Sequence, residues 1–151
     1  MTLAIGAALW MASIVAAPLA IASTRRTVSM GAAIVYGIGA RVCHQRPDRC
    51  FRTAGRPLPV CARCTGLYAG GAIGASAALL LGSALSGRRA RMLAILAALP
   101  TLITWSLEAA SLAHPSNGVR AIAALPLGFV AAWLVIHTVR RAPRPIHRLV
   151  R

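Results

Sequence analysis

The feature that most constrains the fold is the alternation of long, uncharged apolar runs with short clusters of arginine. Five apolar stretches can be drawn, at residues 2–22, 28–40, 65–85, 92–112 and 119–139. A helix needs about 20 apolar residues to cross the hydrocarbon of a bilayer, and only the second stretch is clearly shorter. The sequence therefore predicts an all-α, polytopic transmembrane bundle of four to five helices, forming one membrane domain over residues 1–151.

The charge balance supports a membrane location. The chain has 17 basic residues, all of them arginine, only two acidic residues, and a formal net charge of +15. Arginines placed between apolar runs are typical of loops that flank membrane spans. A nucleic-acid-binding protein needs a basic face on a soluble domain, so no nucleic-acid partner is expected. We expect a multi-pass protein of the cell (inner) membrane that contacts the bilayer and its anionic headgroups, with homo-oligomers as an option and a basic tail at 140–151.

The arginine distribution also bears on topology. Five spans with the N-terminus outside place ten arginines in the cytoplasm and seven outside, whereas four spans, with residues 28–40 in the interface, divide them almost evenly. The positive-inside tendency favours five spans by a thin margin.

The loop at residues 41–66 holds all four cysteines of the chain. Cys61 and Cys64 form a Cys-x-x-Cys pair, which can place two thiolates on one turn, and a more distant Cys-His pair can complete a tetrahedral site. The predicted ligands of a soft metal, with zinc favoured, are Cys43, His44, Cys61 and Cys64, with Cys50 as a substitute. Neighbouring side chains diverge on a regular backbone, so one of Cys43 and His44 could contact a metal ligand without itself binding the metal.

Two other interpretations of this loop stay open. In an oxidising compartment the four cysteines could form two disulfides. Alternatively, Arg63 and the start of the following helix could activate one thiol of the Cys-x-x-Cys pair, which would make the protein a membrane thiol-disulfide redox protein. Whether the chain is an enzyme stays open as well.

A second polar site is predicted around Glu108. A carboxylate within a membrane span is costly, so it normally pairs or functions, and Arg120 is the expected partner. In the five-span arrangement the loop at 41–66 opens on the same side as Glu108, Asn117 and Arg120, so one polar pocket is expected. Arg46 and Arg63 would favour anionic company there. A small transporter that uses Glu108 as a proton relay is a further alternative.

Small residues recur every four positions along the third apolar stretch. They are Gly66, Gly70 and Gly74, followed by Ala78 and Gly82. Such a face lets a second helix backbone approach closely in a membrane. We therefore predict that this helix makes the tightest packing in the bundle and anchors the cysteine loop.

The loop resembles a known family. The segment from Cys43 to Arg49 reads Cys-His-Gln-Arg-Pro-Asp-Arg, and the segment from Pro59 to Gly70 reads Pro-Val-Cys-Ala-Arg-Cys-Thr-Gly-Leu-Tyr-Ala-Gly. Both are similar to motifs of DUF2085, a family of small prokaryotic integral membrane proteins of uncharacterised function. The family's later Pro-x-x-x-Asp-Gly-x-x-Gln pattern is altered here, with Thr104, Trp105 and Glu108 at its Asp, Gly and Gln positions. The resemblance implies a membrane location and a site, and it implies that Cys50 is dispensable.

Overall fold

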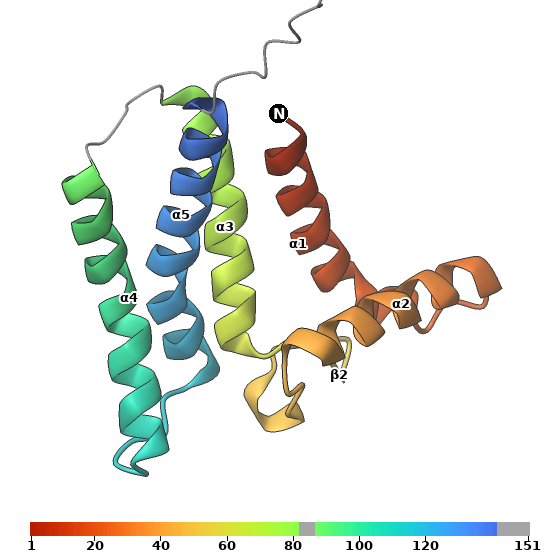
Figure 1. The fold of residues 1–151 in the computed structure, drawn as a ribbon. Helices are drawn as coiled ribbons and strands as arrows, with labels where there is room; N and C mark the ends of the chain where they lie inside the picture. The colour runs from red at the N-terminus through yellow and green to blue at the C-terminus, as the bar shows by residue number, and fades with distance from the viewer. Residues whose placement is uncertain (82–86, 142–151) are drawn as a thin grey trace, which may run out of the picture.

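The computed structural model describes residues 1–81 and 87–141, and within them the fold is all-α. Four helices run side by side, while another runs across the end of the first (Figure 1). The α-helices are α1 (Thr2–Ala20), α2 (Arg26–Val42), α3 (Ala62–Leu80), α4 (Gly87–Ala109) and α5 (Asn117–Arg141). α5 packs between α3 and α4, and α1 packs against α3. The predicted all-α bundle of four to five helices is confirmed.

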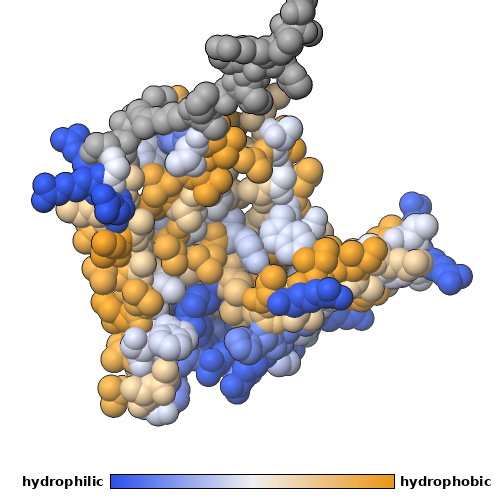
Figure 2. All heavy atoms as spheres, in the orientation of Figure 1, coloured by the Kyte–Doolittle hydropathy of each residue, from blue (hydrophilic) through white to orange (hydrophobic). Residues whose placement is uncertain are grey.

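Three helices, α1, α4 and α5, are long and apolar enough to cross a membrane. α3 is less apolar, but its 19 residues extend about 28 Å beside α5, so it covers a comparable thickness. Large apolar side chains are exposed on all five helices, as Ile5, Ile73 and Ile103 illustrate. Figure 2 shows them as a hydrophobic band above a hydrophilic end. Exposure on this scale is typical of a surface that faces lipid.

α2 does not join the bundle as a span. It is 17 residues long and crosses the end of α1 instead of lying beside it (Figure 1). Its exposed residues Met30, Ile34, Ile38 and Val42 recur every four positions and form one apolar stripe. A single stripe suits a helix that lies in the membrane interface. The preference for five spans is therefore not supported, whereas the four-span alternative fits this arrangement.

The tightest packing is between α3 and α5, on the predicted glycine face. A Cβ atom at Gly66, Gly70 or Gly74 would overlap the backbone of Ala121, Leu125 or Phe129 of α5, respectively. In return, a Cβ atom at Gly128 would overlap the carbonyl oxygen of Leu67. The two backbones thus approach so closely that only glycine fits at these positions. Gly82, the last member of the predicted repeat, and residues 142–151 of the predicted basic tail lie outside the described residues.

The cysteine loop packs against the bundle through a small apolar core. Ile14 of α1 is fully buried with Val60, Leu58 and Cys43. Trp10 and Tyr68 extend this cluster between α1 and α3, with their rings edge to face at 5.9 Å. The loop is therefore held on the bundle end by burial as well as by its connections to α2 and α3.

Candidate functional site: a cysteine cluster beside an arginine-carboxylate cluster

The segment between α2 and α3 contains a short helical turn and a β-hairpin. A 3-10 turn, η1 (Pro47–Arg49), is followed by two short antiparallel strands, β1 (Arg52–Thr53) and β2 (Arg56–Pro57). Ala54 and Gly55, which join the strands, both have positive φ angles. A two-residue hairpin turn with two positive φ angles matches the natural twist of the strands. This hairpin folds the chain back, so that the two cysteine motifs meet.

Polar contacts to the backbone fix the two ends of the loop together. The Gln45 amide donates to the carbonyl oxygens of Tyr36 at 2.8 Å and Pro59 at 2.7 Å. The Tyr36 hydroxyl donates to the carbonyl oxygen of Pro57 at 2.6 Å. Gly39 allows α2 to lie directly against Pro59, because a Cβ atom at position 39 would overlap the Pro59 carbonyl oxygen. α2 and the start of α3 are thus joined next to the cysteines.

Three of the four cysteines come together at this junction. The Sγ atoms of Cys43, Cys61 and Cys64 all lie within 4.8 Å of one another, and the three residues are buried or half-buried. Cys43 follows the last residue of α2, whereas Cys61 precedes α3 and Cys64 lies in its first turn. The Cys61 amide donates to the Cys43 sulfur at 3.1 Å. This three-cysteine cluster could hold a metal ion.

Neighbouring groups shift the pKa of the Cys61 thiol. The hydrogen bond from Cys64 lowers the pKa of the Cys61 thiol to about 5, against an opposing effect of burial. This shift favours the thiolate of Cys61, and a thiolate is the form that binds metals and attacks disulfides.

Cys50 is separate from the cluster. Its thiol donates to the Arg46 carbonyl oxygen at 3.1 Å, and burial raises its pKa to about 11. The three sulfurs that converge do not include it. All four cysteines are free thiols.

His44, the fourth predicted ligand, lies apart from the sulfurs. Cys43 has extended backbone angles, φ −145° and ψ 144°, and its side chain is buried, whereas the His44 side chain is exposed. Adjacent side chains on extended backbone point to opposite sides, which explains the divergence. The cluster of ligand atoms found among the described residues therefore contains three sulfurs and no imidazole.

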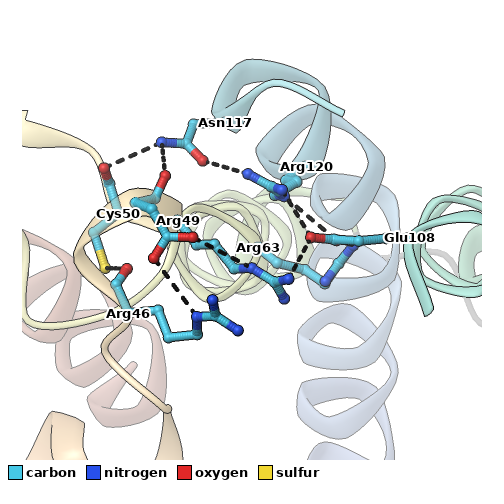
Figure 3. Close-up of polar contacts among 8 residues, drawn as sticks. Arg46, Arg49, Cys50, Arg63, Glu108, Asn117 and Arg120 are labelled. Atoms are coloured by element: carbon cyan, nitrogen blue, oxygen red, sulfur yellow. Dashed lines mark hydrogen bonds and ion pairs between the residues drawn. The ribbon is translucent and has the colours of Figure 1, made fainter. Parts of the chain in front are cut away.

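Glu108 is the centre of the second polar group (Figure 3). Its side chain is only 5% exposed, and it pairs with Arg120 at 2.7 Å, Arg63 at 3.1 Å and Arg49 at 3.1 Å. These arginines come from η1, α3 and α5, so one carboxylate ties α4 to three other segments. The expected pairing of Glu108 with Arg120 is present, and two further arginines join it.

Asn117 links this cluster to the cysteine loop. Its amide nitrogen donates to the Cys50 carbonyl oxygen at 3.1 Å, and its amide oxygen accepts from Arg120 at 2.8 Å (Figure 3). Arg46 pairs with the exposed Asp48 at 3.6 Å. The predicted polar residues thus meet at one end of the bundle, where Glu108 is the shared acceptor of Arg63 and Arg120.

The sequence did not single out Arg49 or Gln45 as site residues. Both belong to the Cys-His-Gln-Arg-Pro-Asp-Arg segment, and the scarcity of acids was an available sign for Arg49. The chain has only two acidic side chains and 17 basic ones, so a buried carboxylate is expected to pair with more than one arginine. Gln45 offered no comparable sign, because its partners are backbone carbonyls.

Comparison with known proteins places these residues in a family. The model of the family described as "Predicted membrane protein (DUF2085)" matches residues 43–134. The chain belongs to the DUF2085 family. The match begins at Cys43 and ends within α5, so it contains both the cysteine cluster and the arginine-carboxylate cluster.

Two proteins similar in sequence to this DUF2085 chain are archaeal and uncharacterised. One, from Methanothermobacter thermautotrophicus, is 32% identical over 93 residues, which cover 62% of this chain and 83% of the relative. The other, from Methanocaldococcus jannaschii, is 42% identical over 40 residues, 26% of each chain. No solved structure matches the chain.

Proposed function

We propose that the protein is a multi-pass protein of the cell (inner) membrane that binds a soft metal ion, with zinc favoured, at the membrane face. The observation that supports this most is the convergence of the Cys43, Cys61 and Cys64 sulfurs within 4.8 Å. With Zn–S bonds of about 2.3 Å, the sulfurs of a tetrahedral site lie about 3.8 Å apart. A small inward movement of the three side chains would suffice to bind the ion.

Three converging sulfurs favour a metal over a disulfide staple. A disulfide between two of them would leave the third as an unpaired, half-buried thiol beside it. Cys50 does not supply a fourth sulfur to the group, since its thiol donates to the Arg46 carbonyl oxygen. A metal, in contrast, uses all three sulfurs as equivalent ligands.

The proposed topology has four crossing helices, α1, α3, α4 and α5, with α2 in the interface. The apolar stripe of α2 lies toward the hydrophobic band of the bundle, and hydrophilic residues lie beyond it (Figure 2). The cysteine loop and the α4–α5 connection then lie at the same face of the membrane (Figure 1). This face is where the metal would be bound.

We expect detergent-purified protein to contain about one zinc per chain, measured by elemental mass spectrometry. The variant Cys61→Ser/Cys64→Ser should lose it, because a single remaining thiolate cannot hold the ion. Cys50→Ser is the matched control, since Cys50 lies outside the three-sulfur group. Absence of metal from the wild-type protein after purification and zinc reconstitution would disprove the proposal.

One substitution tests whether His44 binds the metal. We expect His44→Ala to retain zinc and to weaken its binding less than about tenfold, because the imidazole is exposed and outside the sulfur group. A water molecule then completes the tetrahedron. Competition with a chromogenic chelator measures the affinity. A loss close to that of the double cysteine variant would instead make His44 the fourth ligand, as its place in the sequence suggests.

Thiol-disulfide exchange is the second candidate, and accessibility favours it. Cys61 precedes α3 and lines a cavity that opens to the surface, so a partner could reach this residue. The Cys61 and Cys64 thiols would lose two protons and two electrons to a disulfide-bearing partner, which would be reduced to a dithiol. Metal-free protein whose Cys61 and Cys64 thiols are oxidised to a disulfide by a disulfide reagent, which is itself reduced to a dithiol, would favour redox over metal binding. The transporter alternative has weaker support, because three guanidinium groups already hold Glu108.

A further inference from the structure

A cavity of about 220 Å³ lies between the two clusters, at the end of the bundle that carries the cysteine loop. It is lined by His44, Arg46, Arg49, Cys61, Arg63, Trp105 and Arg120, and we call it the arginine cavity. A water molecule occupies about 30 Å³ of liquid, so there is room for an anion the size of phosphate together with water.

The arginine cavity has an uncompensated positive charge. Four guanidinium groups line it, and the nearby carboxylates are Asp48, which pairs with Arg46, and Glu108, which pairs with the other three arginines. These are the two acidic side chains of the whole chain, so four positive charges face two negative ones. No other acidic side chain exists in the sequence to balance the remainder.

One buried donor in this wall has no partner. The Nε atom of Arg63 is buried and, within residues 1–81 and 87–141, it is one of two buried side-chain nitrogens without a hydrogen-bond acceptor. A buried, unsatisfied donor on a charged group is costly, because its hydration is lost without replacement. An acceptor oxygen supplied by a ligand would remove this cost.

We propose that the arginine cavity binds one phosphate group, a function separate from the metal proposed above. Guanidinium groups bind phosphate oxygens through paired, charge-assisted hydrogen bonds, and four of them converge here. Trp105, 56% exposed beside the cavity, is the kind of side chain that settles at headgroup depth. The phosphate therefore belongs either to a lipid headgroup or to a small soluble molecule, and the chemistry is the same.

The test uses delipidated protein in a neutral detergent at constant ionic strength. One arm titrates inorganic phosphate by calorimetry. The other adds mixed micelles that contain phosphatidylglycerol or, as the comparison without a phosphate group, diacylglycerol, and counts retained lipids by native mass spectrometry. We expect saturable binding of one phosphate-bearing probe per chain.

Arg46→Gln should weaken this binding at least tenfold. The Arg46 side chain is 59% exposed and pairs only with the exposed Asp48, so the variant should fold normally. Arg56→Gln removes the same charge from the same loop, but Arg56 does not line the cavity, and it should change binding less than twofold. Binding of inorganic phosphate identifies a soluble ligand, whereas binding of phosphatidylglycerol alone identifies a headgroup. No saturable binding of either probe, or equal weakening by both variants, would overturn the proposal.

Discussion

Replacing Glu108 with glutamine is expected to destabilise the protein by about 3 to 5 kcal/mol, the range found when one partner of a buried ion pair is removed. The carboxylate accepts from or pairs with Arg49, Arg63 and Arg120, and its side chain is 5% exposed. Without it, three guanidinium groups repel one another at the end of the bundle. An amide has the same shape but carries no charge that could hold them.

The measurement is the unfolding of the purified protein in detergent by increasing fractions of sodium dodecyl sulfate, followed by circular dichroism. Asp48→Asn is the matched control, because it removes the other acid of the chain from a side chain that is 62% exposed. Exposed ion pairs contribute about 0 to 1 kcal/mol, so this control should change little. Equal, small effects of the two substitutions would show that Glu108 does not hold the cluster.

The second large effect is expected at Gly70. Gly70→Ala should destabilise the protein by about 3 kcal/mol, the upper end of the range for overpacking, because the added Cβ atom would overlap the backbone of Leu125. Backbone atoms cannot turn aside as a side chain can, so α3 and α5 would have to separate along their length. The same unfolding assay measures the loss.

Gly71 provides the control on the same helix. A Cβ atom there would lie 3.8 Å from the Gly128 carbonyl oxygen, which is an ordinary contact. Gly71→Ala should therefore be neutral or slightly stabilising, since alanine favours the helix by up to about 1 kcal/mol over glycine. If the two alanine variants unfold alike, close approach of the two backbones does not explain why glycine recurs every four residues within α3.

Much of this structure follows from local patterns in the sequence. The apolar runs at 2–22, 92–112 and 119–139 predicted α1, α4 and α5 to within a few residues at most ends, because length and apolarity determine such helices. The glycine spacing identified the face of α3 that meets α5. The pairing of Glu108 with Arg120 was also predictable, since a buried carboxylate needs a cation and Arg120 begins the next helix.

Other features depend on tertiary geometry that no local pattern contains. The orientation of α2 was not predictable, because a short apolar run suits a tilted span and an interfacial helix equally well. Arg63 lies 45 residues from Glu108 in sequence, and the packing of both α3 and α4 on α5 brings them together. The divergence of Cys43 and His44 was foreseen as a difficulty, but which of the two joins the cluster depends on how α2 ends.

The arginine-carboxylate cluster also attaches α4 to the rest of the bundle. α4 packs mainly on α5, where the Thr101 hydroxyl donates to the Ala123 carbonyl oxygen at 2.8 Å and Glu108 binds the arginines. It contributes none of the glycines that bring α3 and α5 together. An element without such interlocking depends for its local stability on its polar contacts, here the ion pairs of Glu108. We therefore expect α4 to separate from α5 before α3 and α5 separate from each other.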